Sequence, residues 1–116
     1  MADSPQRPTA LAGTRRLAGY HTLPAWDPYE DYVGPMYERV SDDGVRCAME
    51  IEARHCNTAG IAHGGLLMTF ADYASFVIAR EAIGGPGGAT VSMTSDFTAP
   101  VGIGDLLESD GEIMRE

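Results

Sequence analysis

The stretch that most limits the fold of this chain runs from Leu66 to Ala79 and carries one formal charge, on Asp72. On a helix its apolar side chains would point in every direction; they are Leu66, Leu67, Met68, Phe70, Ala71, Ala74, Phe76, Val77, Ile78 and Ala79. A helix that is apolar all round is buried rather than laid on a surface. This one is too short to cross a bilayer, which takes about 20 apolar residues. We therefore expect a central helix wrapped by other elements, and no membrane association.

Strand patterns lie on both sides of this helix. Val45–Ala53 alternates cleanly, with Val45, Cys47, Met49, Ile51 and Ala53 on one face. Together with Met36–Val40 it predicts a hairpin around Ser41-Asp42-Asp43-Gly44. Thr90–Thr98 and Leu106–Met114 predict two further strands after the helix. The order β-β-α-β-β indicates an α+β fold with an antiparallel sheet packed on the helix.

Proline and glycine residues predict where the helical segments begin and end. Asp27-Pro28 predicts a short helix, capped by Asp27, that Gly34-Pro35 ends. Gly84-Gly85-Pro86-Gly87-Gly88 ends the central helix, because glycine suits a left-handed cap and proline cannot continue a helix. No helix follows this glycine-rich run, so a plain connection is favoured over a phosphate cradle.

Length and composition narrow the function. The chain has 116 residues, which fits a flexible N-terminal tail or a loosely docked arm over residues 1–25 and a single domain over residues 26–116. A net charge of −9 excludes a nucleic-acid partner, which needs a basic patch. All basic side chains are arginine, which excludes a Walker-type phosphate loop and lysine Schiff-base chemistry. Two cysteines outside any Cys-x-x-Cys pair, without a signal peptide, predict reduced thiols and a cytoplasmic location.

The expected start of the helix is one candidate site. Gly64 and Gly65 stand where backbone N–H groups lack partners within the helix and where the helix dipole is positive. Such an end can hold a developing oxyanion. His63 has two interpretations: it satisfies a buried turn, which general hydrogen-bonding behaviour favours, or it contacts a ligand.

Asp72 is the sharper candidate. A carboxylate on an apolar helix is costly to bury unless it is paired, so it is either a site residue or hydrogen-bonded to neighbours such as Thr69 or Tyr73. Gly64 and Asp72 lie about 12 Å apart along a helix axis. One helix cannot bring both to a small substrate, but two antiparallel helices from a dimer can. This predicts an active site shared at a two-fold interface.

Other chemistries lack their motifs. No Gly-x-Ser-x-Gly elbow is present, which argues against a serine hydrolase. Cys56 beside His55 or His63 is better explained as a small buried thiol than as a nucleophile. The three histidines and two cysteines show no zinc spacing, so we expect no metal.

The spacing Asn57-x-x-Gly60-x-x-His63-Gly64-Gly65, followed by Asp72, Thr90, Pro100 and Gly104-Asp105, resembles the hotdog-fold acyl-CoA thioesterases of the phenylacetate-degradation (PaaI-like) group. The resemblance runs from about Gly34 to the end of the chain. It implies an antiparallel sheet wrapped around one long helix, in a homodimer or a dimer of dimers, and an acyl-CoA substrate. It implies no cofactor.

The resemblance also implies roles for single residues. The Gly64 N–H would polarise the thioester carbonyl, with Asn57, His63 and Gly65 helping to position the substrate. Asp72 of a partner subunit would act as general base or as nucleophile, and Thr90 would hold the water. Arg54 and Arg80 are the local candidates for the coenzyme phosphates.

One expectation concerns a departure from the family. Its members continue for two more strands beyond the one that ends near Met114, so we expect a C-terminally truncated fold with an unpaired sheet edge.

The first alternative function is a non-catalytic acyl-CoA-binding or regulatory hotdog module. The second is hydration chemistry on the same fold.

Overall fold

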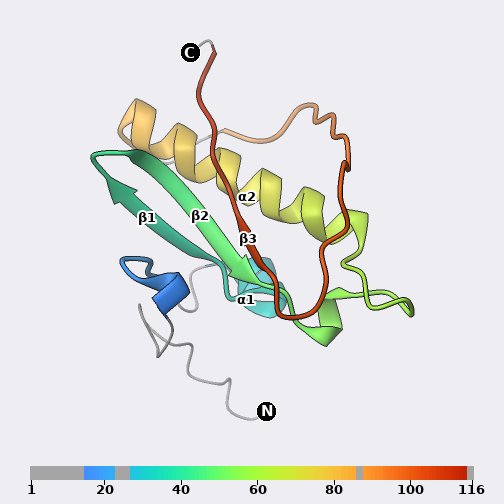
Figure 1. Cartoon of the computed structure of the whole chain (residues 1–116). Coiled ribbons are helices and arrows are strands. Elements are labelled where there is room, and N and C mark those ends of the chain that lie inside the picture. The colour runs from blue at the N-terminus through green and yellow to red at the C-terminus, as the bar shows by residue number, and fades with distance from the viewer. Residues whose placement is uncertain (1–14, 23–26, 86–87, 115–116) are drawn as a thin grey trace.

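The computed structural model describes residues 15–22, 27–85 and 88–114. Its elements are the short helix α1 (Pro28–Val33), strands β1 (Tyr37–Ser41) and β2 (Gly44–Glu50), the long helix α2 (Gly64–Ile83), strand β3 (Leu106–Glu108), and the 3-10 turns η1 (Arg15–Leu17) and η2 (Ala53–His55). The three strands form one antiparallel sheet in the order β1-β2-β3, and α2 runs across it (Figure 1). The predicted α+β class is confirmed.

The predicted hairpin around Ser41-Asp42-Asp43-Gly44 is present as β1 and β2. Tyr37 pairs with Ala48, and the ladder ends at Ser41 opposite Gly44. Gly44 has a φ of 113°, a backbone conformation that glycine adopts without strain. The expected strand over Val45–Ala53 is too long, because the chain leaves β2 after Glu50 and turns into η2 at Ala53.

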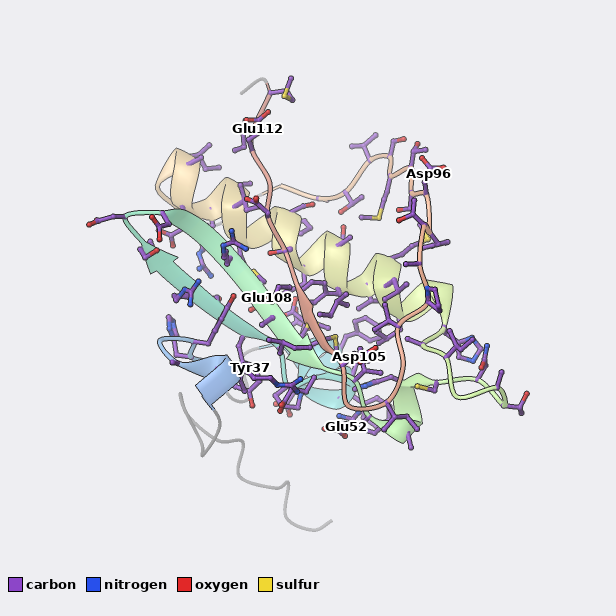
Figure 2. All side chains as sticks on the ribbon, in the orientation of Figure 1. Tyr37, Glu52, Asp96, Asp105, Glu108 and Glu112 are labelled. Carbon is purple, nitrogen blue, oxygen red and sulfur yellow. The ribbon has the colours of Figure 1, made fainter. Side chains whose placement is uncertain are left out.

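Helix α2 packs on one face of the sheet. Because side chains alternate along a strand, Cys47 and Met49 on β2 point toward α2 together with Ile51 just beyond it. The helix meets them with one buried stripe: Leu66, Phe70, Tyr73, Ala74 and Val77. Side chains from both elements fill the layer between them (Figure 2).

The expectation that α2 is buried on all sides is wrong for the single chain. Met68, Phe76 and Ile78 are only half-buried. A three-stranded sheet covers one side of a helix, so a chain that folds in this way leaves the remaining apolar positions partly exposed.

The opposite face of the sheet is covered by the N-terminal segment. Leu17 and Tyr20 are 1% and 0% exposed, and they pack with Tyr37 and Ala48. The Tyr20 hydroxyl donates a 2.9 Å hydrogen bond to the Glu108 carboxylate of β3. The described residues 15–22 of the expected tail are therefore docked on the sheet, while residues 1–14 and 23–26 lie outside the described part of the chain.

The strand predicted over Thr90–Thr98 is absent: this described segment is not in a strand, and its Val91 is 97% exposed. The alternation marks two faces, but a strand also needs a neighbouring edge to pair with. The strand predicted over Leu106–Met114 is shortened to β3, which pairs with β2 as far as Ala48 opposite Glu108. Ser109 prolongs the contact, because its N–H donates to the Cys47 carbonyl at 2.9 Å.

Both predicted helix boundary signals are present. The Asp27 carboxylate accepts a 3.0 Å hydrogen bond from the Glu30 N–H at the start of α1. Gly84 follows α2 with a φ of 81°, and its N–H donates to the Arg80 carbonyl at 2.9 Å. Pro86 and Gly87 of the glycine-rich run lie outside the described residues.

Candidate active site

Asp72 and Thr90 are in direct contact. The Thr90 hydroxyl donates a hydrogen bond to Oδ1 of Asp72, in the middle of α2, so the segment after the glycine-rich run is tied to the helix. Asp72 is half-buried. The carboxylate is therefore held in one orientation and remains open to a ligand, as a group acting on water or on a carbonyl must be.

The start of α2 presents backbone N–H groups. His63 stands at the N-cap position, its side chain makes no capping hydrogen bond, and its carbonyl accepts from the Leu66 N–H at 3.0 Å. The first amides of a helix lack partners within it, and the dipole adds about half a positive charge there. This end of α2 is therefore suited to a carbonyl oxygen that gains negative charge.

The two glycines at this end have different surroundings. A Cβ on Gly64 would lie 3.2 Å from Cε2 of Phe97, whereas a Cβ on Gly65 would meet nothing within 4 Å. The Phe97 ring thus lies against Gly64, in a pocket of about 290 Å³ that both residues line.

Gly65 and Asp72 instead line a shared pocket of about 250 Å³, together with Met68, Thr69 and Tyr73. Gly65, Met68, Thr69 and Asp72 thus form one wall of this pocket from a single face of α2. Gly64 is not among the residues that line it, in keeping with the expectation that Gly64 and Asp72 of one chain do not meet at one small substrate.

His63 and His55 have separate roles. His63 is exposed and lines a neighbouring pocket of about 530 Å³. His55 is buried: its Nδ1 accepts a 2.9 Å hydrogen bond from the Glu52 N–H, and its Nε2 lies 2.7 Å from the Val33 carbonyl oxygen. An acceptor at Nδ1 and a carbonyl at Nε2 require the neutral ring with its proton on Nε2. His55 is therefore a structural link from η2 to α1.

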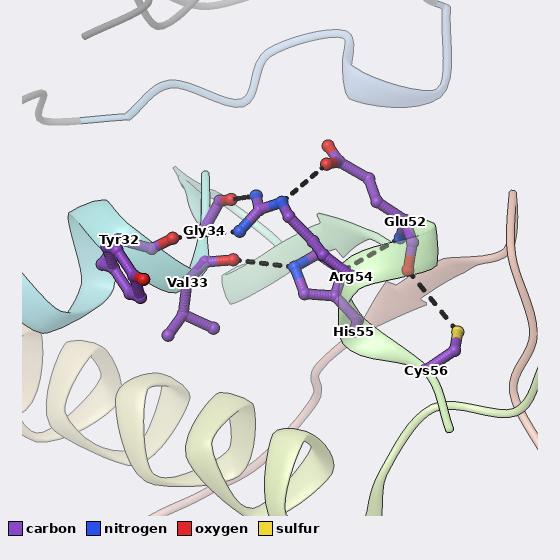
Figure 3. Close-up of polar contacts among 7 residues, drawn as sticks. All are labelled: Tyr32, Val33, Gly34, Glu52, Arg54, His55 and Cys56. Atoms are coloured by element: carbon purple, nitrogen blue, oxygen red, sulfur yellow. Dashed lines mark hydrogen bonds and ion pairs between the residues drawn. The ribbon is translucent and has the colours of Figure 1, made fainter. Parts of the chain in front are cut away.

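Arg54 continues the same link (Figure 3). Its guanidinium donates to the Tyr32 carbonyl at 2.9 Å and to the Gly34 carbonyl, and its Nε donates to the Glu52 carboxylate at 2.9 Å. Backbone carbonyls at a helix C-terminus lack partners within the helix, so Arg54 supplies donors that the end of α1 needs.

Arg80 is engaged as well. It pairs with the buried carboxylate of Glu38 on β1 and lies 3.3 Å from Glu81. The hydrogen bond to Glu38 raises the pKa of Arg80 above its ordinary value. Both arginines considered for the coenzyme phosphates thus hold the fold together.

Asn57 shapes the loop before α2. Its Oδ1 accepts from the N–H of Ala59 at 2.9 Å and of Ile61 at 3.2 Å, and the Gly60 N–H donates to its carbonyl at 3.0 Å. An asparagine side chain commonly holds a turn in this way. The geometry gives Asn57 a role in the turn, and its contact with a substrate stays a prediction.

The cysteines do not form a nucleophile–base pair. Both thiols are free; Cys56 Sγ donates to the Glu52 carbonyl at 3.5 Å, and both ring nitrogens of His55 have other partners. Cys47 is buried, and burial raises the pKa of its thiol to about 12.

Tyr29 is a pocket residue that the sequence analysis missed. Its hydroxyl lies 2.9 Å from Oγ1 of Thr69, forty residues further along the chain, and it lines both the 250 Å³ and the 530 Å³ pockets. The only available signal was the recurrence of aromatic residues between positions 26 and 37.

Within residues 15–22, 27–85 and 88–114, no three His, Cys, Asp or Glu side chains gather closely enough to hold a metal ion. No helix in this part of the chain has the length and apolarity needed to cross a membrane.

Comparison with known proteins places this geometry in context. The sequence model that describes the thioesterase superfamily matches residues 59–116 of this chain, a range that includes α2 and β3. A protein of Pseudomonas aeruginosa that carries the provisional name of an esterase is 35% identical over 94 residues, covering 78% of this chain and 69% of that protein.

Mammalian relatives are more distant. Mouse acyl-coenzyme A thioesterase 13 is 30% identical over 70 residues, and the human protein of that name is 28% identical over 72 residues. These matches cover 60% and 62% of this chain, and the chain spans about half the length of each mammalian relative.

Proposed function

The chain belongs to the thioesterase superfamily, with its hotdog domain, and from this premise we propose that it hydrolyses an acyl-CoA to a free acid and CoA. The family supports thioester hydrolysis, and the names of the mammalian relatives support CoA as the thiol part. The observation that carries the proposal is the half-buried Asp72 carboxylate, held by Thr90 on a helix whose N-terminus has no side-chain cap and whose first N–H groups lack partners within the helix. We place the chain in the PaaI-like group on the motif spacing.

In the proposed reaction, the Gly64 N–H donates to the thioester carbonyl oxygen, and Asn57, His63 and Gly65 help to position the substrate. Asp72 removes a proton from water, the water oxygen attacks the carbonyl carbon, and the C–S bond breaks to release CoA thiolate. In the alternative, the Asp72 carboxylate attacks the carbonyl carbon first, the C–S bond breaks to release CoA thiolate, and water then opens the mixed anhydride. Label in the Asp72 carboxylate after turnover in H₂¹⁸O would establish the nucleophilic route, because water that opens the anhydride at the Asp72 carbonyl carbon leaves its oxygen there.

The proposed site is shared between two subunits. Gly64 and Asp72 stand eight residues apart on one helix, about 12 Å along its axis. Two antiparallel α2 helices would bring Gly64 of one subunit to Asp72 of the other, in a homodimer or a dimer of dimers. We propose that this enzyme acts in the cytoplasm without a metal or redox cofactor.

A mixing experiment tests the shared site. Asp72→Asn removes the acid, and Gly64→Pro removes the N–H at a helix position that tolerates proline. Each variant alone should release little thiol from acyl-CoA. Refolded as an equal mixture, they should recover about a quarter of the wild-type rate, because half of the dimers contain one intact site. A mixture as inactive as its components would contradict subunit sharing.

A further inference from the structure

The hydrogen bond between Tyr29 and Thr69 stands between two pockets. The smaller one, of about 250 Å³, reaches Asp72, and the larger one, of about 530 Å³, reaches His63 and Tyr32. The residues common to both linings are Tyr29, Gly65 and Thr69. The Tyr29 hydroxyl lies 2.9 Å from Oγ1 of Thr69, so this contact belongs to the wall that the two pockets share, the partition.

The partition is held from both ends of α1. At the C-terminal end, Arg54 binds the carbonyls of Tyr32 and Gly34, and His55 binds that of Val33 (Figure 3). At the N-terminal end, the Asp27 carboxylate caps the helix. Since the backbone of α1 is fixed in this way, the Tyr29 ring is held over α2 by more than its own hydroxyl.

The larger pocket suits hydrocarbon. Tyr29, Tyr32, Val33 and Leu66 contribute aromatic and aliphatic walls. Its Arg54 and buried His55 already have partners in η2 and α1, so an apolar group entering this space would leave their hydrogen bonds in place.

We propose that Tyr29 is a specificity-determining residue: its contact with Thr69 confines the acyl group to the smaller pocket beside Asp72 and so selects short acyl chains. This rests on the proposed function. Without the Tyr29 side chain the two pockets join, and a longer acyl chain extends from the smaller pocket beside Asp72 into the larger pocket.

The test measures kcat/KM over straight-chain acyl-CoA substrates from butanoyl to hexadecanoyl. Wild-type protein should prefer the short members. Tyr29→Ala should raise the ratio of long-chain to short-chain kcat/KM about tenfold or more, because apolar pocket contacts discriminate by that order. Ile83→Ala is the control: Ile83 is a large apolar residue of α2 that is 56% exposed and lines neither pocket, so its ratio should stay at the wild-type value.

Two further variants separate the hydroxyl from the ring. Tyr29→Phe and Thr69→Val each remove the hydrogen bond and leave the bulk, so we expect them to shift the ratio in the same direction and by less than Tyr29→Ala. These near-isosteric changes keep the test valid if Tyr29→Ala fails to fold. An unchanged ratio in folded, active Tyr29 variants would overturn the partition. Wild-type protein that hydrolyses no member of the series would instead overturn the proposed function.

Discussion

The Thr90 hydroxyl donates a hydrogen bond to the Asp72 carboxylate and so joins the segment after α2 to the middle of that helix. The contact fixes one oxygen of the carboxylate and leaves the other for water or substrate. It joins two residues that lie eighteen positions apart, on either side of the glycine-rich run.

Loss of this contact should slow catalysis. Thr90→Val keeps the shape of the side chain but removes the donor, and a hydrogen bond to a charged group is worth about 1.5–3 kcal/mol. We expect kcat for acyl-CoA hydrolysis to fall at least about tenfold, with partial recovery in Thr90→Ser. Thr94→Val, at an exposed threonine of the same segment, is the control. Equal rates for the Thr90 and Thr94 variants would remove Thr90 from the site.

A pair of Gly64 variants separates the effect of losing the backbone N–H from the effect of adding a side chain. Both Gly64→Ala and Gly64→Pro add a Cβ against the Phe97 ring, which is 55% exposed and can move aside. Only proline lacks the N–H. Gly64→Pro should therefore lose about 10²–10³-fold in kcat relative to Gly64→Ala, the usual cost of one oxyanion donor. Matching rates for the two variants would show that the amide does not bind the reacting oxygen.

Arg54 should matter for stability. Arg54→Ala removes the donors that reach the Tyr32 and Gly34 carbonyls, and we expect the free energy of unfolding in urea to drop by about 1–3 kcal/mol. Arg54→Lys should recover only part, because a single ammonium lacks the guanidinium fork. Arg46→Ala, which loses a 4.0 Å pair with the exposed Asp110, should cost less than about 1 kcal/mol. An Arg54 variant as stable as the Arg46 variant would contradict this role.

The buried Cys47 thiol predicts a loss of stability in alkali. Burial raises its pKa from 9.0 to about 12, so above pH 9 the unfolded chain loses a proton that the folded protein keeps. The contribution of the Cys47 thiol to the free energy of unfolding should thus be fully present below pH 9 and be lost as the pH rises toward 12. The loss amounts to about 1.4 kcal/mol for each unit by which the two pKa values differ.

Urea unfolding at a series of pH values measures this slope. Tyr20, whose pKa burial raises to about 12, adds to it in the same direction. Cys47→Ala should therefore have a shallower slope than wild type without abolishing it. Parallel curves for the two proteins would show that the thiol is not protected in the fold.

Local signals in the sequence predicted much of the fold. The all-round apolarity of the run from Leu66 to Ala79 identified α2, its end at Gly84 followed from the glycine-rich run, and the hairpin turn followed from the cluster Ser41-Asp42-Asp43-Gly44. Strand length was predicted less well, because alternation over Thr90–Thr98 specifies faces but not a pairing edge. The docking of Leu17 and Tyr20 gave no periodic signal, since it depends on the far face of a sheet formed later in the chain.

The candidate site was predicted in part. The motif spacing singled out Asp72 and Thr90, but it did not predict the hydrogen bond between them within one chain, and their catalytic roles stay predictions. The Tyr29–Thr69 hydrogen bond joins residues forty positions apart, so no local pattern could reveal it. The structural role of His55 was also missed, because its partners are a carbonyl and an amide that carry no sequence signature.

The most direct test of the account is the kcat of Asp72→Asn for thiol release from acyl-CoA. Asparagine keeps the size of the side chain and an oxygen for the Thr90 hydroxyl but can neither take a proton nor attack a carbonyl. Asp42→Asn, in the exposed hairpin turn, controls for the loss of one charge. We predict that Asp72→Asn lowers kcat by about 10²–10⁴-fold while the circular dichroism spectrum stays that of the wild type. A folded Asp72→Asn protein that turns over as fast as Asp42→Asn would contradict it.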